Sequence, residues 1–156
     1  MKEVRLGGGL YIHSNEINVQ IKKLSDKAVV PVYHSEQASG CDLVASEDVT
    51  IMPGETSLIP IGLAFQLPSD YELQIRPRSG LSAKTKFRVL FGTVDSDYRG
   101  EVKIIADNTG TAPFFIKQGD RIAQGVFAPV IRGVFQVVEE LEETERNKSG
   151  FGSSGT

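Results

Sequence analysis

The sequence predicts an all-β fold, because short strand-like segments alternate with turn residues along most of its length. In YELQIRP, strict alternation places Tyr71, Leu73 and Ile75 on one face of a strand. Residues 49–68 contain two β-rich segments on either side of a Pro-Gly turn. Strands and turn signals at such regular spacing are typical of a β-sandwich or barrel.

The remaining elements follow from the same criteria. Further strands are expected where β-branched and aromatic residues cluster between Gly, Pro, Asn and Asp, at residues 19–24, 87–91, 101–107, 112–116 and 122–130. Only SGLSAKTK (79–86) and EELEETER (139–146) have helical character, and both are short.

A β-hairpin is expected in GTVDSDYRGE, residues 92–101. Val94 precedes an acidic turn, and Tyr98 begins the return to a strand pattern. From the residues alone, Asp95 and Asp97 are turn residues, because aspartate commonly caps turns.

Composition fits one domain with an ordinary core. The 156 residues include 17 Lys and Arg against 20 Asp and Glu, a net charge of -3, so we expect no nucleic-acid partner. Cys41 is the only cysteine, which favours the cytoplasm, or the cytosol or nucleus of a host cell if the protein is viral. The sequence has neither the apolar core of a signal peptide nor about 20 consecutive apolar residues, so no membrane association is expected.

Three segments are expected along the chain. Residues 1–17 are an N-terminal extension, because Gly7 to Gly9 interrupt any strand there. Residues 18–145 form the β domain. Residues 146–156 (RNKSGFGSSGT) form a flexible C-terminal arm, because ordering so many Gly and Ser residues has a high entropic cost.

Common phosphate-binding and zinc-binding patterns are missing. There is no P-loop and no G-x-G-x-x-G after a strand, and His13 and His34 have no second ligand at zinc spacing. RPRSGLSAK (76–84) is either an anion-binding nest before a short helix or a surface loop. Gln124 is a polar residue in an otherwise apolar strand and so needs a partner, which could be purely structural.

Five segments, taken in order, resemble the motifs of the trimeric deoxyuridine triphosphate pyrophosphatases (dUTPases). They are SGCDL (39–43), PRSGL (77–81), GTVDSDYRGE (92–101), GDRIAQ (119–124) and RNKSGFGSSG (146–155). The resemblance spans about residues 18–156 and implies the dUTPase-like β-clip, a distorted jelly-roll barrel with at most one or two short helices.

The resemblance implies hydrolysis of dUTP to dUMP and pyrophosphate, which limits uracil incorporation into DNA and supplies dUMP for dTMP synthesis. Asp95 would be the general base that activates the attacking water. Mg²⁺ would be the cofactor, bound to phosphate oxygens and waters, with Asp42 holding it through water.

Substrate-binding roles are implied residue by residue. Arg78, Ser79, Gln124 and Arg146 would contact the phosphates. Tyr98 would pack under the deoxyribose, and Phe151 would stack on uracil. The full implied set is Arg78, Ser79, Gly80, Gly92, Thr93, Val94, Asp95, Tyr98, Gln124, Arg146, Phe151, Gly152 and Ser153.

The implied assembly is a homotrimer with shared active sites, in which the C-terminal arm is a ligand-ordered lid. Two alternatives remain. A dCTP deaminase shares the fold, but its chemistry needs a glutamate and an arginine arranged for attack on cytosine, whereas this segment has Asp-Ser-Asp-Tyr. A regulatory protein that uses nucleotide binding as a switch would carry a large insert between motifs, which this chain lacks.

Overall fold

The computed structural model describes residues 4–5, 11–12 and 16–144, and over these ranges the fold is all-β, as predicted. The strands are β1 Val4–Arg5, β2 Tyr11–Ile12, β3 Gln20–Lys23, β4 Cys41–Val44, β5 Val49–Ile51, β6 Thr56–Pro60, β7 Leu63–Gln66, β8 Tyr71–Arg76, β9 Phe87–Val89, β10 Gly92–Val94, β11 Lys103–Asn108, β12 Phe114–Ile116 and β13 Arg121–Pro129. The helix among them is α1, Ser79–Lys84.

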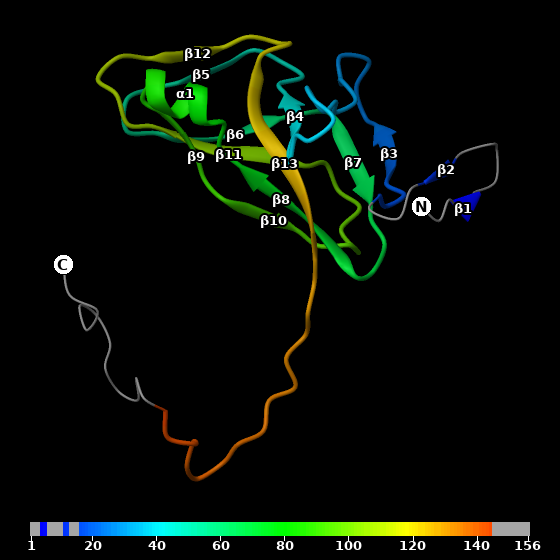
Figure 1. Ribbon diagram of the computed structural model, residues 1–156. Helices are drawn as coiled ribbons and strands as arrows, with labels where there is room; N and C mark the ends of the chain where they lie inside the picture. The colour runs from blue at the N-terminus through cyan, green and yellow to red at the C-terminus, as the bar shows by residue number, and fades with distance from the viewer. Residues whose placement is uncertain (1–3, 6–10, 13–15, 145–156) are drawn as a thin grey trace.

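The strands form small antiparallel sheets rather than one continuous sheet (Figure 1). The largest has the order β10-β8-β13-β4, and a three-stranded sheet has the order β6-β11-β9. The pairs β12-β5, β3-β7 and β1-β2 complete the described topology. Neighbours in these sheets are mostly distant in sequence, so the fold depends on long-range pairing.

One hydrophobic core lies between the two larger sheets. Leu73 and Ile75 from β8 belong to the same buried cluster as Ile59 from β6 and Ile104 from β11. The alternation predicted for YELQIRP is therefore confirmed, although Tyr71 is only half-buried. Because β8 directs these residues into the core, its alternate residues lie on the opposite face of the sheet.

The segment 49–68 forms three strands, one more than the two expected. The Pro-Gly turn is confirmed, with Gly54 at a φ of 77°. A second interruption lies at Gly62, whose φ is 67° and where an added Cβ would be 2.9 Å from the Cβ of Ala28. Only glycine adopts this left-handed backbone easily, so the chain bends there and β7 separates from β6.

One of the two expected helices is present. α1 matches the prediction for residues 79–86, but the prediction for residues 139–146 is wrong over its described part, because 139–144 have no helical structure. Glu139, Glu140, Glu142 and Glu143 repel one another at helical spacing, and this exposed segment packs no apolar face.

The prediction of a β-hairpin at residues 92–101 is also wrong, because the strands on either side of the turn do not pair with each other. β10 pairs with β8, whereas β11 pairs with β6 and β9, so the two strands separate after the turn in which the Tyr98 N–H donates to the Asp95 carbonyl at 3.1 Å. The strands separate because Val94 and Ile104 pack against the core from different sheets.

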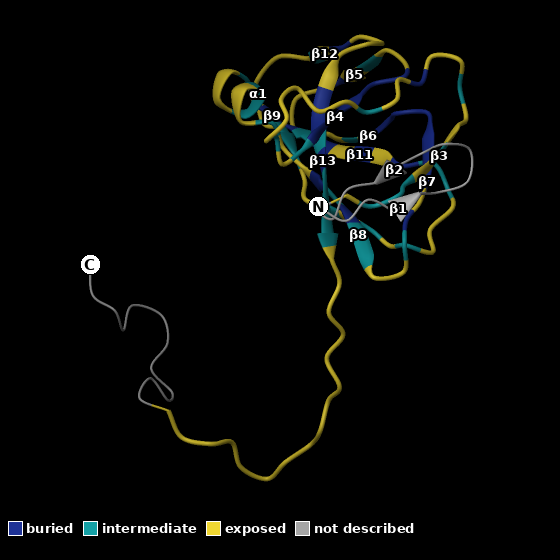
Figure 2. Ribbon diagram, turned by 45° about the vertical axis from the view of Figure 1, so that its right-hand side comes forward, coloured by how far each residue is buried: buried dark blue, intermediate teal, exposed yellow. Residues whose placement is uncertain are grey.

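The end of the described chain leaves the body of the molecule. After β13 every residue from 130 to 144 is exposed, in an extended path away from the sheets (Figure 2). Ile131, Val134, Phe135 and Val137 are each more than 90% exposed. These four apolar side chains are therefore almost fully accessible, away from the core that the sheets enclose.

The structure describes little of the predicted N-terminal extension and none of the predicted C-terminal arm. Most of the extension 1–17, and all of the arm 146–156, lie outside the described residues. Within the described ranges, no helix has the length and apolar character needed to span a membrane.

Candidate functional site

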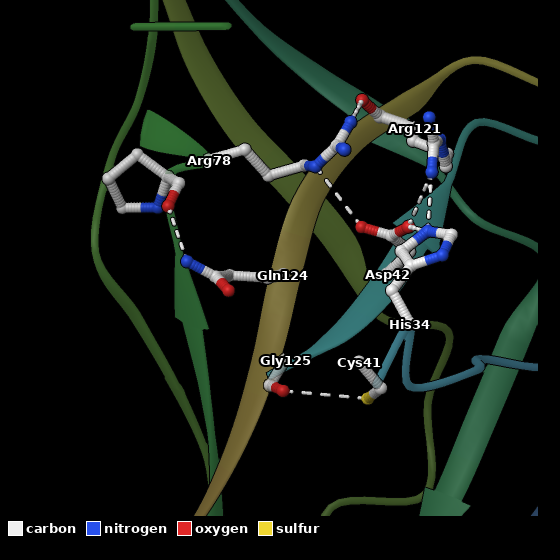
Figure 3. A network of polar contacts seen from close by, with 8 residues as sticks. His34, Cys41, Asp42, Arg78, Arg121, Gln124 and Gly125 are labelled. Atoms are coloured by element: carbon white, nitrogen blue, oxygen red, sulfur yellow. Dashed lines mark hydrogen bonds and ion pairs between the residues drawn. The ribbon is translucent and has the colours of Figure 1, made fainter. Parts of the chain in front are cut away.

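Asp42 lies at the centre of a polar cluster on the four-stranded sheet (Figure 3). It belongs to β4, whose four residues are all buried, and it pairs with Gln124 of β13. β4 was not predicted as a strand, because four residues are too few to show a period. Asp42 itself is only 7% exposed, so its carboxylate must be compensated by neighbouring donors.

Arg78 supplies the first of these donors. It immediately precedes α1, and its Nε lies 3.1 Å from Asp42 Oδ1. Its NH1 donates to the carbonyl of Arg121 at 2.7 Å. The guanidinium thus bridges the β4 carboxylate and the β13 backbone, which fixes the loop before α1 against the sheet.

Arg121 and His34 complete the cluster. Arg121 NH1 is 3.3 Å from Asp42 Oδ2, and His34 Nε2 contacts both that oxygen and Arg121 NH1. Neither residue was among the predicted site residues. Arg121 could have been found, because it lies within GDRIAQ, but nothing in the sequence around His34 indicated its position.

Gln124 has the structural partner that its position required. Its Nε2 donates to the carbonyl of Pro77 at 2.9 Å, next to Arg78. A Cβ on Gly40 would lie 2.5 Å from Gln124 Oε1 and 3.2 Å from Gln124 Cβ. Glycine at position 40 therefore leaves the space that the Gln124 side chain occupies.

Asp42 keeps one acceptor position open, which is what a magnesium ion held through water would need. No group of three His, Cys, Asp or Glu side chains suited to a metal occurs in the described ranges, so a cage made only of protein ligands is not available there. Asp42 Oδ2 contacts two side chains and Oδ1 contacts Arg78. Because a carboxylate oxygen accepts two hydrogen bonds, Oδ1 retains capacity for a water molecule.

A separate pocket of about 540 Å³ contains the third motif. Its lining residues are Leu58, Thr93, Val94, Asp95, Tyr98, Glu101, Val102, Lys103 and Ile105. Asp95 is exposed just beyond β10, and the Tyr98 hydroxyl donates to the Glu101 carbonyl at 3.2 Å. The ring of Tyr98 lies against Gly100, where an added Cβ would be 2.6 Å from its Cζ.

Open strand edges border this pocket. β10 is the edge strand of its sheet, and Gly92 approaches Ile75 so closely that a Cβ would lie 3.3 Å from the Ile75 Cβ. β11 pairs with β9 only from Ala106 onward, so at Lys103 the edge away from β6 has no strand partner among the described residues. Unpaired strand edges offer backbone donors and acceptors to a ligand.

The pocket and the Asp42 cluster lie far apart on one chain. β10 and β4 are opposite edges of the four-stranded sheet. Val94 pairs with Leu73, whereas Asp42 aligns through Gln124 with Arg76, three residues further along β8. Standard strand dimensions give about 17 Å between the backbones of Val94 and Asp42.

The predicted site residues therefore fall into three groups. Thr93, Val94, Asp95 and Tyr98 line the pocket, with Gly92 beside them on β10. Asp42, Arg78 and Gln124 gather at the cluster, and Ser79 and Gly80 are exposed at the start of α1. Arg146, Phe151, Gly152 and Ser153 lie outside the described residues.

Cys41, next to Asp42, is a buried free thiol. Its Sγ donates to the Gly125 carbonyl at 3.4 Å. Burial chiefly raises the pKa of the Cys41 thiol, and the Asp42 carboxylate adds to the effect. Burial also raises the pKa of Tyr33, with Cys41 contributing. A thiol with a raised pKa is a poor nucleophile, so Cys41 is a packing residue.

Comparisons with known proteins agree on one family. The dUTPase family model matches residues 26–155. The deoxyuridine 5'-triphosphate nucleotidohydrolase of Nautilia profundicola is 50% identical over 141 residues, covering 89% of this chain and 99% of that protein. The protein of that name from a Wolbachia species of Brugia malayi is 49% identical over 152 residues, covering 92% and 97%.

Solved structures give the same result. A variant of the dUTPase of Staphylococcus bacteriophage 80alpha with dUpNHpp matches with a TM-score of 0.85 and 28% identity, covering 89% of this chain and 99% of that one. A variant of the dUTPase from phage phi11 of S. aureus, described with a structural Mg(II) ion, matches with a TM-score of 0.77 and 26% identity, covering 81% and 99%. The chain belongs to the dUTPase family of hydrolases.

Proposed function

We propose that this protein hydrolyses dUTP to dUMP and pyrophosphate. The observation that carries the proposal is the pocket between the open edges of β10 and β11, which has Asp95 and Tyr98 in its wall. Membership of the dUTPase family supports the same substrate.

Uracil recognition would use the backbone of this pocket. Uracil presents an acceptor, a donor and an acceptor along O4, N3–H and O2, whereas cytosine presents a donor and two acceptors. Backbone groups between Gly92 and Tyr98 can match the first pattern and leave cytosine with unpaired polar groups. The absence of a side chain at Gly92, next to Thr93 in the pocket wall, supports this role, because it leaves the β10 backbone accessible there.

The sugar would be read by Tyr98. Its hydroxyl donates to the Glu101 carbonyl, and its ring lies in the space left by the missing side chain of Gly100. A ring fixed under the deoxyribose would leave a ribose 2′-hydroxyl in steric conflict or without a partner.

Asp95 would act as general base. It is an exposed carboxylate in the pocket wall, and among the described residues no hydrogen bond competes for its side chain. It can therefore accept a proton from a water that attacks the α-phosphorus in line with the leaving pyrophosphate.

The phosphates would bind at the Asp42 cluster. Arg78 and Arg121 bring two positive charges to one carboxylate, so the trio retains a net positive charge for an anion. Ser79 and Gln124 lie beside them and can donate to phosphate oxygens. Bound Mg²⁺ would neutralise part of the triphosphate charge, with Asp42 holding it through water.

A complete site would require more than one copy of the chain. The pocket and the cluster are about 17 Å apart at the backbone, which is too far for one α-phosphate to meet Asp95 while its neighbours meet Arg78. The exposed apolar segment 130–144 supports an assembly in which it packs on a neighbouring copy. We infer a homotrimer with shared sites, closed by the arm 146–156.

In the cell, this reaction would limit uracil incorporation into DNA and supply dUMP for dTMP synthesis. A cytoplasmic location would fit this role, because nucleotides are made there and because the thiol of Cys41 is free.

The test is pyrophosphate release from dUTP, dCTP and UTP, each with Mg²⁺ and with EDTA, together with the solution mass. We expect release from dUTP alone, loss of release with EDTA, and a mass three times that of the chain. Ammonia release from dCTP would instead support a deaminase, and a monomer with full activity would contradict the shared site.

A further inference from the structure

His34 is the member of the Asp42 cluster that lies outside all five motifs (Figure 3). It belongs to the irregular segment between β3 and β4, and the Asp42 N–H donates to the Val32 carbonyl at 3.1 Å. This backbone bond ties the segment to β4 and brings the imidazole over the Asp42 carboxylate. His34 is therefore held at the phosphate end of the site by the fold itself.

The imidazole faces two groups of opposite hydrogen-bonding character. Its Nε2 contacts Asp42 Oδ2, which only accepts, and Arg121 NH1, which only donates. A neutral imidazole nitrogen either donates or accepts, so His34 can satisfy one partner at a time through this atom. Two arrangements of the cluster would satisfy this rule, one with His34 bonded to Arg121 and one with His34 bonded to Asp42.

A bound phosphate would decide between these arrangements. Half of the Arg121 side chain is exposed, so its guanidinium can turn toward an anion. A phosphate oxygen is a stronger acceptor for a guanidinium than a neutral imidazole is. Once Arg121 bonds to phosphate, the exposed imidazole can change tautomer through water, losing its proton from Nδ1 and gaining one at Nε2, and then donate to Asp42 Oδ2.

We propose that His34 is a positioning residue for the phosphates: it holds Arg121 beside Asp42 in the free protein and bonds to Asp42 when phosphate takes Arg121. The proposal rests on the proposed function, because it assumes that the cluster binds the substrate's phosphates. Its effect would come from ordering a long side chain before the ligand arrives, which is worth about three- to tenfold in affinity.

The experiment measures the affinity of the full chain, with Mg²⁺ present, for the non-hydrolysable analogue dUpNHpp and for dUMP by calorimetry. His34→Ala should weaken dUpNHpp binding about three- to tenfold and leave dUMP affinity unchanged, because dUMP lacks the outer phosphates. His34→Gln should restore the affinity, because its amide has a separate donor and acceptor. Gln37→Ala, an exposed change in the same segment, is the matched control.

Three outcomes would overturn the proposal. One is an unchanged dUpNHpp affinity in His34→Ala, another is an equal loss for dUMP, and the third is a His34→Gln protein as weak as His34→Ala. Thermal unfolding of each variant identifies any loss caused by misfolding, and the exposed position of His34 makes that loss small. Wild-type protein that binds neither nucleotide would instead refute the proposed function and, with it, this role.

Discussion

The Arg78 guanidinium and the Asp42 carboxylate form an ion pair in which Nε lies 3.1 Å from Oδ1. The pair joins the motifs SGCDL and PRSGL, which are separate in the sequence. The same guanidinium also donates to the carbonyl of Arg121, in the motif GDRIAQ, at 2.7 Å. Arg78 therefore fixes the positions of three motifs relative to one another.

Replacing Arg78 with lysine should not preserve function, because an ammonium cannot bridge Asp42 and Arg121 with the geometry of a guanidinium. We expect kcat/KM for dUTP to fall at least about tenfold, as for loss of a hydrogen bond to a charged group. Steady-state kinetics measure this, with Lys84→Arg, on the helix that follows Arg78, as a charge-matched control. Equal activity of Arg78→Lys and wild type would show that charge alone suffices.

Asp95→Asn should bind dUTP normally but turn it over slowly. The amide preserves the shape of the side chain and removes the base, which is worth about 10²- to 10⁴-fold in rate. Single-turnover pyrophosphate release and dUpNHpp affinity separate the two effects. Asp97→Asn, in the same exposed turn, should leave the rate near that of wild type; a near-normal rate in Asp95→Asn would remove Asp95 as the base.

Tyr98→Ala should raise UTP hydrolysis relative to dUTP hydrolysis, because the ring that excludes the ribose hydroxyl is gone. Tyr98→Phe keeps the ring and loses only the 3.2 Å bond to the Glu101 carbonyl, so its ratio should stay near that of wild type. The ratio of kcat/KM for the two nucleotides is the measurement. If the ratio is the same in Tyr98→Ala and wild type, the sugar is read elsewhere.

Deleting residues 146–156 should leave a folded trimer with little activity. Ordering about ten residues costs on the order of 10 kcal/mol of backbone entropy, so the arm should add little to the fold without a ligand and act only when uracil and phosphates are bound. Solution mass and thermal unfolding report on the assembly, and pyrophosphate release reports on closure. Full activity of the truncated protein would show that the arm has no part in the site.

Stability should fall in alkaline solution partly through Cys41. Because burial raises the pKa of its thiol in the folded state, the folded protein holds this proton at pH values where the unfolded chain has lost it. The stabilisation is thus present below the ordinary cysteine pKa of about 8.5 and is lost as the pH rises above it.

Cys41→Ala should remove this contribution. Between about pH 7.5 and about pH 9.5 the free energy of unfolding should fall less steeply in this variant than in wild type, by at most about 1.4 kcal/mol per pH unit. Urea denaturation at the two pH values makes the comparison. Parallel declines would show that folding does not raise the pKa of the thiol.

The sequence by itself determined the fold class and the family of this protein. Alternation in YELQIRP and the regularly spaced turns predict strands without any knowledge of how the strands pair. The five motifs indicate the family, because each is a short run of residues adjacent in the sequence. Local chemistry also sufficed for the Pro-Gly turn and α1, because backbone preference there depends on neighbouring residues alone.

Only the tertiary structure decided how these pieces meet. The segment 92–101 resembles a hairpin locally, yet packing of Val94 and Ile104 in different sheets separates its strands and opens the pocket. Residues 139–144 have helical propensity but no packed face to stabilise a helix. His34 reaches Asp42 through a loop anchored by one backbone bond, and such long-range contacts leave no periodic trace in the sequence.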